Sequence, residues 1–148
     1  VNEGWIEATP GNVIDYDIIR ERIREDAGVY NVREIGFDRW GATQIVTQLQ
    51  SDGAKVVPLG QGFVSLSAPT KELEKFILGG KIRFGRNPVM RWMFSNVMVR
   101  MDPAGNVKPD KQKSTEKIDG VVATVMALDR ALRNLGPSVY ETRGILVL

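Results

Sequence analysis

The sequence predicts an α/β protein of one domain that contains a parallel sheet. Two short segments rich in β-branched residues, 32–38 and 54–59, flank a segment with helical periodicity, 41–53, and another helical segment, 14–28, precedes them. Strand, helix and strand joined by short connections are typical of a parallel βαβ unit. The length of 148 residues and the 43% hydrophobic content suffice for one buried core.

The N-terminal end of the chain is expected to form a strand and then a helix. Residues 3–8 have the composition of a short strand. The helix over 14–28 is capped by Asp15 or Asp17 and ends at Gly28. Helical spacing brings its apolar residues to one face: Ile14, Ile18, Ile19, Ile23 and Ala27.

The βαβ unit follows directly. The segment 32–38 indicates a buried strand that ends at Asp38, and Pro58 places the strand 54–59 at a sheet edge or at its own end. The helix between them covers 41–53. Since ligands of parallel sheets bind at the carboxyl ends of the strands, Asp38 lies where a site is expected.

A third helix is predicted over 67–79. Ser67 is its expected cap, Pro69 falls in its first turn and Gly79 ends it. The four residues 81–84 then indicate a short strand.

The last part of the chain predicts a helix, a hairpin and a long helix. Asn87 and Pro88 open the first helix, and residues 97–107 read as a hairpin around the turn 102–106. The long final helix presents an apolar face made of Ile118, Val121, Val122, Val125, Leu128 and Leu132. The tail 134–148 has no clear assignment.

Composition restricts the chemistry. The chain has neither cysteine nor histidine, which excludes disulfides, thiolate metal sites, Ser-His triads and histidine general bases. Catalysis would have to use carboxylates, lysines, hydroxyls or a metal bound by oxygen, and oxygen ligands suit Mg²⁺ or Mn²⁺. The net charge of +2 favours an anionic partner without requiring one. No apolar run is long enough to span a membrane.

Two carboxylates carry the main chemical hypothesis. Asp38 ends a predicted strand and Asp119 begins the final helix, and an α/β fold can bring both to one rim, within about 8 Å of each other. There they could hold a pair of divalent ions across a phosphodiester. The alternative is structural, with Asp38 as a turn residue and Asp119 as a helix cap.

A cluster of lysines lies in and after the predicted hairpin. These are the candidate DNA-binding residues: Lys108, Lys111, Lys113 and Lys117. They could follow a phosphate backbone. Because Asp110 and Glu116 are interspersed among them, a solvated loop of mixed charge is the alternative.

Four strings resemble a known family along nearly the whole chain to about residue 133. They are "ATPGNVIDYDII", "IGFDRWGATQIVTQLQSDG", "VPLGQGFVSLSAPTKELEKFILGGKI" and "NVMVRMDPAGNVKPDKQKSTEKIDGVVATVMALDRAL". Together they resemble the C-terminal nuclease domain of tailed-bacteriophage terminase large subunits, in the HK97-like branch.

The resemblance implies a ribonuclease-H-like fold and a metal-dependent endonuclease that cuts concatemeric viral DNA during packaging. Of the family's three acidic metal ligands, the second matches Asp38 in "GFDRW" and the third matches Asp119 in "KIDG". Gly120 would leave room beside the metal. The resemblance also implies two Mg²⁺ or Mn²⁺ ions, double-stranded DNA as substrate, the portal and the small terminase subunit as partners, and the cytoplasm of the bacterial host as location.

The chain departs from the family at its N-terminal end. The family's first acid lies on the first strand of the sheet, and neither Glu3 nor Glu7 matches it. We therefore expect residues 1–148 to be one truncated nuclease domain without the ATPase domain and the first strands, which puts its own activity in question. The strand 32–38 would have a free edge that pairs with a second copy or with the terminal "RGILVL". Two carboxylates in place of three predict weak binding of divalent ions.

Two other interpretations stay open at this level. The segment could be a non-catalytic module that docks the packaging machine onto partners or DNA. It could also belong to another ribonuclease-H-like enzyme, such as a resolvase or integrase, for which Glu116 is the only local candidate for a further acid.

Overall fold

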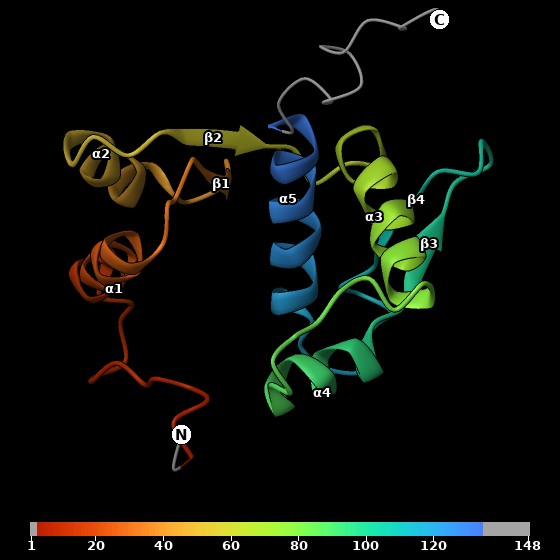
Figure 1. Ribbon diagram of the computed structural model, residues 1–148, viewed down its shortest axis with the longest axis horizontal. Helices are drawn as coiled ribbons and strands as arrows, with labels where there is room; N and C mark the ends of the chain where they lie inside the picture. The colour runs from red at the N-terminus through yellow and green to blue at the C-terminus, as the bar shows by residue number, and fades with distance from the viewer. Residues whose placement is uncertain (1–2, 135–148) are drawn as a thin grey trace, which may run out of the picture.

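The computed structural model describes residues 3–134 of the chain. The elements in chain order are α1 (Tyr16–Val29), β1 (Ile35–Asp38), α2 (Thr43–Ser51), β2 (Val56–Leu59), α3 (Phe63–Leu78), α4 (Pro88–Asn96), β3 (Val99–Met101), β4 (Val107–Pro109) and α5 (Asp119–Arg133). Helix α5 stands between two groups of elements (Figure 1): α1, β1, α2 and β2 lie on one side, and α3 with the β3–β4 hairpin lies on the other.

The predicted parallel βαβ unit is confirmed. Strands β1 and β2 pair in parallel, with Ile35 opposite Val56 and Asp38 opposite Leu59. Helix α2 connects them, as its periodicity predicted. Within the described part of the chain β1 pairs only with β2, so the idea that its other edge recruits a second copy stays a prediction. The "RGILVL" segment lies outside the described residues.

Helix α1 begins where its cap was expected. The Asp15 side chain accepts a hydrogen bond from the Asp17 backbone N–H at 2.9 Å. The helix continues through Gly28 to Val29, so Gly28 does not end it. None of its residues is buried: α1 packs on α2 and leaves Ile19 exposed.

Two predicted strands are absent from the described chain. Residues 3–8 form turns and irregular backbone, and residues 81–84 are irregular as well. A strand needs a partner for its backbone groups, and neither segment has one. Ile82 and Phe84 instead pack against the core cluster beneath α3. The composition of residues 81–84 suggested a strand, but their apolar side chains pack into the core from irregular backbone.

Helix α3 begins four residues earlier than predicted. It starts at Phe63, so Ser67 is not its cap: the serine is buried within the helix, and its Oγ accepts a hydrogen bond from the Val107 N–H at 3.1 Å. Pro69 therefore lies inside the helix. The prediction was wrong because a proline ordinarily marks the first turn, where its missing N–H costs nothing.

Helix α3 ends at its C-cap Gly79, as predicted. The Lys81 N–H bonds the Phe76 carbonyl and the Gly80 N–H bonds the Ile77 carbonyl, with Gly80 at φ +60°. This pair of bonds satisfies the last carbonyls of the helix and requires a left-handed residue, a conformation that glycine adopts without steric cost.

The core lies along α5. Its buried residues form two clusters: Leu66, Leu73 and Val125, and Ile118, Val121 and Val122. The predicted apolar face of this helix is confirmed, although Leu128 and Leu132 are only half-buried. The predicted hairpin is confirmed as the antiparallel β3–β4 pair, and Asn87 caps α4 through hydrogen bonds from the N–H groups of Val89 and Met90. Over residues 3–134, no helix combines the length and apolarity that crossing a membrane would need.

Candidate metal and nucleic-acid site

Asp38 is the last residue of β1. Its Oδ1 accepts a hydrogen bond from the backbone N–H of Trp40 at 3.3 Å, which bends the chain away from the sheet in the manner of an Asx turn. Asp38 is half-buried, whereas the Trp40 side chain is 87% exposed. The carboxylate thus stands at the end of a strand with one oxygen engaged by the backbone.

Asp119 is the first residue of α5 and its side chain is 62% exposed. The Nζ of Lys111 lies 2.5 Å from its Oδ1. This ammonium, opposed by desolvation and assisted by Lys117, holds the pKa of the Asp119 carboxyl below its usual range. The start of a helix also favours a negative charge. At neutral pH Asp119 is therefore an ionised, accessible carboxylate.

The loop before α5 positions Lys111. Asp110 is buried, and its Oδ1 accepts hydrogen bonds from the N–H groups of Gln112 and Lys113 at 3.0 and 3.3 Å. The Asp110 N–H in turn bonds the Met98 carbonyl at 2.8 Å. A tight turn held by a buried carboxylate thus presents Lys111 to Asp119. Sequence reasoning assigned Asp110 only to a loop of mixed charge.

Gly120 serves packing. A Cβ at this position would lie 2.7 Å from the sulfur atoms of both Met90 and Met93. The Gly120 N–H points at the Met93 sulfur, 3.1 Å away. The space that the resemblance reserved for a metal is filled by α4, and this close approach fixes the helix start that carries Asp119.

The four candidate lysines have different surroundings. Lys108 donates to the Gln61 carbonyl at 2.9 Å and lies 5.5 Å from the centroid of the Phe63 ring, so it holds the start of α3. Lys111 is paired with Asp119. Lys113 and Lys117 form no ion pair with the described residues and are exposed.

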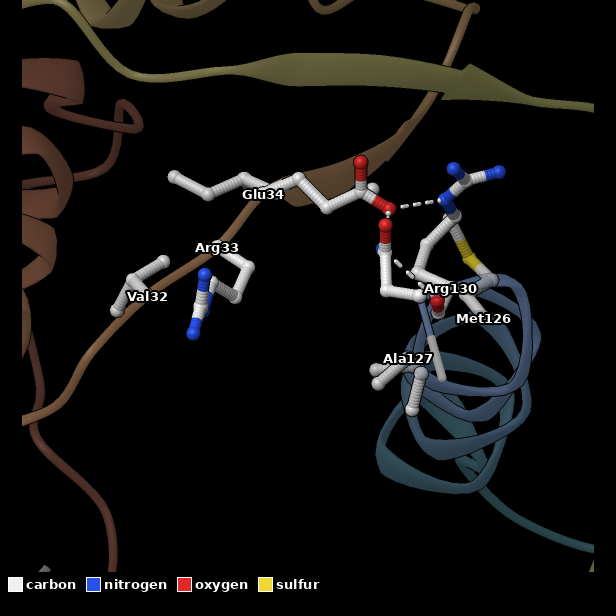
Figure 2. Close-up of a pocket in the computed structure, with 11 residues that line it drawn as sticks. Val32, Arg33, Glu34, Met126, Ala127 and Arg130 are labelled. Carbon is white, nitrogen blue, oxygen red and sulfur yellow. Dashed lines mark hydrogen bonds and ion pairs between the residues drawn. The ribbon is translucent and has the colours of Figure 1, made fainter. Parts of the chain in front are cut away.

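The two aspartates belong to different elements: Asp38 ends β1 and Asp119 begins α5. Strand β1 meets α5 near the end of that helix: Glu34 bonds Arg130 at 2.5 Å (Figure 2), and a Cβ on Gly36 would lie 3.6 Å from the Cγ of Arg130. Asp119 precedes Arg130 by roughly 16 Å of helix, at 1.5 Å per residue. Within 3–134 no three acidic residues cluster as a metal site. The predicted approach of Asp38 and Asp119 to about 8 Å, close enough to share two ions, stays a prediction.

Sequence reasoning missed Glu34, which connects β1 to α5. Its carboxylate lies beside Arg130, Lys55 and Asn134, and it borders a pocket of about 470 Å³ between residues 32–36 and the second half of α5 (Figure 2). Arg130, the first of these partners, lowers the pKa of Glu34 to about 2. The sequence did offer a signal: Glu34 lies within the predicted buried strand 32–38, and a buried acid needs a cationic partner.

Comparison with known proteins decides the family. The family described as "Terminase large subunit, endonuclease domain" matches residues 1–134. The chain belongs to this family. The predicted family is thus confirmed.

The relatives of this terminase nuclease chain include phage and bacterial proteins. It is 36% identical over 133 residues to "Terminase, large subunit" of Enterobacteria phage HK97, covering 88% of this chain and 26% of the relative. It is 34% identical over 134 residues to "Protein YmfN" of Escherichia coli strain K12, covering 89% and 30%. The chain therefore spans about a quarter to a third of the length of these relatives.

Solved structures agree with this family. The crystal structure of the HK97 bacteriophage large terminase superposes with a TM-score of 0.80 at 35% identity, covering 87% of this chain and 27% of that one. The large terminase nuclease from thermophilic phage G20c gives a TM-score of 0.60 at 16% identity, covering 84% and 64%, and supports the fold alone. The predicted ribonuclease-H-like fold of terminase nuclease domains is confirmed.

Proposed function

We propose that this terminase nuclease chain cleaves double-stranded DNA with Mg²⁺ or Mn²⁺ held by Asp38 and Asp119. The observation that carries the proposal is the match of residues 1–134 to the terminase endonuclease family. Asp38 at the end of β1 and Asp119 at the start of α5 support it, because both offer carboxylate oxygens at accessible ends of elements.

The donor set fits such an ion. Mg²⁺ is commonly bound through one or two carboxylates, while waters and substrate phosphates complete its coordination. Two aspartates therefore suit it, and the chain has no histidine or cysteine that would favour zinc. When bound, divalent ions would activate water and stabilise the leaving oxygen of a phosphodiester.

The protein's own residues prepare this site. Lys111 keeps Asp119 ionised, and the contact of Gly120 with Met90 and Met93 holds the helix start in place. The Trp40 N–H orients the Asp38 carboxylate through one oxygen and leaves the other without a described hydrogen bond. Lys117 adds positive charge near Asp119, where it would neutralise phosphates of the DNA backbone, and Lys113 is exposed in the preceding loop.

The proposal extends to the biological setting of the relatives. By analogy with the protein named "Terminase, large subunit", the substrate would be concatemeric phage DNA in the cytoplasm of the bacterial host. The portal and the small terminase subunit would be the partners.

A plasmid assay tests the proposal. Supercoiled plasmid is incubated with the chain in Mg²⁺, Mn²⁺ or EDTA, and nicked and linear products are quantified. Nicking is expected only with a divalent ion. Asp38→Asn and Asp119→Asn should each reduce it by at least about 100-fold, more than the loss of an outer-shell partner costs. The control Asp26→Asn changes an exposed aspartate of α1 that pairs with Arg22, and it should retain full activity.

One observation favours a second candidate. No cluster of three acidic residues lies within 3–134, which is compatible with a non-catalytic module that binds DNA or docks the packaging machine. A wild-type chain that binds DNA but leaves the plasmid intact in both metals would favour this candidate. Cleavage that survives in both aspartate variants would contradict the proposed site.

A further inference from the structure

One stretch of the chain is positively charged throughout. Residues 75–101 contain no aspartate or glutamate, although the whole chain has 18 acidic residues against 20 basic ones. The basic residues of this stretch are Lys75, Lys81, Arg83, Arg86, Arg91 and Arg100. Since six of the 20 basic residues lie in this stretch, 14 basic residues stand against 18 acidic ones outside it, so the chain's excess of positive charge comes from residues 75–101.

These cations differ from the arginines of α1 and α5 in their partners. Arg20, Arg22 and Arg24 of α1 and Arg130 and Arg133 of α5 all pair with carboxylates. In the stretch 75–101, Lys75 pairs with Glu72, but no other cation there makes an ion pair with a residue in the described range. Their charge is therefore available to an external anion.

Two of these arginines border one pocket. Arg86 and Arg91 line a pocket of about 830 Å³ together with Asn87 and Ser95. Its apolar wall includes Phe84 and Phe94, whose ring centroids are 4.7 Å apart. Arginine presents a rigid fork of N–H donors that matches the oxygens of a phosphate group.

The backbone at Arg86 is unusual. Among the described non-glycine residues, Arg86 alone has a positive φ, at 59°, and it follows Gly85 at φ 57°. A left-handed conformation is unfavourable for a residue with a Cβ, and such residues gather at functional sites. The turn brings Arg86 to the rim of the pocket just before Asn87 caps α4.

The position of α4 connects this pocket to Asp119. Met90 and Met93 of α4 contact Gly120, the residue after Asp119. Helix α4 lies at the end of α5 where that helix begins (Figure 1). Arg91 directly follows Met90, so the arginine belongs to the helix that packs beside Asp119.

We propose that Arg86 and Arg91, with the exposed Lys81 and Arg83 of the same acid-free stretch, form a DNA-binding surface, here called the cationic surface, which holds backbone phosphates of the strand that passes Asp119. This rests on the proposed function, since it takes DNA as the ligand. DNA is favoured over an acidic protein segment because the helix that carries Arg91 packs against Gly120, the residue after the candidate cleavage residue, and because phosphates recur along the strand at regular spacing. Lys113 and Lys117 would then contact one side of the strand near Asp119, and the cationic surface would contact the next phosphates.

DNA binding without cleavage tests the cationic surface. The affinity of the 148-residue chain for a fluorescent duplex of about 30 base pairs is measured by anisotropy in EDTA over a range of salt concentrations. The variant Arg86→Gln with Arg91→Gln should weaken binding by about tenfold or more at roughly 100 mM salt and lower the slope of log K against log salt by about 2. The variant Arg86→Lys with Arg91→Lys should keep most of the affinity.

A matched control removes the same charge elsewhere. Arg22→Gln with Arg24→Gln deletes two cations of α1 that already pair with acids, and it should change the affinity less than about twofold. Arg86→Gly should keep the melting temperature, since glycine suits a positive φ, and still weaken DNA binding. That result separates a loss of contact from a loss of folding.

The outcomes are distinct from those of the plasmid assay. Equal weakening by the α1 control would show that net charge alone matters and would overturn the cationic surface. Unchanged affinity in the Arg86 and Arg91 variant would overturn it as well, and would leave an acidic protein segment as the partner to examine. A tenfold loss of affinity in a chain that never nicks plasmid would support the cationic surface while refuting nuclease activity.

Discussion

The two sides of α5 are held together by different forces. Of the nine buried hydrophobic residues in the described chain, seven belong to α3, β4 and the Ile118–α5 segment, and only Leu49 and Leu59 lie within residues 3–62. Burial of apolar surface is the dominant favourable term in folding. The side that contains α3 and the hairpin is therefore the stable part of the molecule.

The side that contains the βαβ unit depends on charged contacts. Arg20 and Arg24 reach Asp52 at 2.5 and 3.0 Å and join α1 to the end of α2. Glu34 joins β1 to Arg130 of α5. Asp119 thus lies at the start of a helix packed in the apolar core, whereas Asp38 belongs to a unit attached by ion pairs. Because pH and salt weaken ion pairs, we expect them to affect the position of Asp38 more than that of Asp119.

The largest difference is expected from equal truncations on the two sides. Ile118→Ala removes a side chain that is 2% exposed and should lower the free energy of unfolding by about 2–5 kcal/mol. Ile19→Ala in α1 removes the same atoms at 38% exposure and should cost less than about 1 kcal/mol. Urea denaturation of both variants measures the contrast, and equal losses would contradict the assignment of the core.

The second prediction concerns the connection between the two sides. Arg130, then Lys55 and Asn134, lower the pKa of Glu34 from an ordinary 4.5 to about 2. Because the folded pKa is below the unfolded one, this contribution to stability is present above about pH 5 and is lost as the pH falls toward 2. Glu34→Gln should lower the melting temperature by several degrees at pH 7. Between about pH 5 and pH 2, the melting temperature of the variant should fall less steeply than that of the wild type.

Hydrogen exchange locates that effect. In the Glu34→Gln variant, amides of β1 and β2 should exchange faster while those of α5 keep their protection. Glu25→Gln, which changes an exposed acid of α1 paired with Arg22, should leave both regions unchanged. Uniform loss of protection would show that the two sides unfold as one unit.

The smallest effect is expected at Asp52. Its pKa lies well below the usual range because of Arg20 first and then Arg24. Asp52→Asn should weaken the attachment of α1 and lower the melting temperature less than Glu34→Gln does. Since salt screens exposed charges, the difference between wild type and variant should shrink at about 1 M salt. An effect that grows with salt would contradict an electrostatic attachment.

Features governed by neighbours in the chain were predictable. Asp15 and Asn87 cap α1 and α4 as their residue types indicate. The Asp102 side chain accepts hydrogen bonds from the N–H groups of Ala104 and Asn106 and closes the hairpin turn. Each interaction spans at most four residues, so the sequence carries the whole signal.

Features that need a distant partner were less predictable. The segments 3–8 and 81–84 have the composition of strands but find no pairing partner in the described chain. Ser67 looks like a cap but accepts a hydrogen bond from Val107, 40 residues away. The absence of a side chain at Gly120 suggested space for a metal, but that space is occupied by the sulfur atoms of two methionines of α4. In each case residue type suggested one use, and a partner from another element determined a different one.

The sequence by itself determined the family, the parallel βαβ unit, and the two carboxylates at a strand end and a helix start, because these depend on residue type and local periodicity. Only the tertiary structure decided that Lys111 pairs with Asp119, that α4 packs against Gly120, and that Glu34, just before β1, meets Arg130 of α5. Those two residues are 96 positions apart in the chain. Local propensity carries no information about such contacts, which form only when packing of the apolar faces brings distant side chains together.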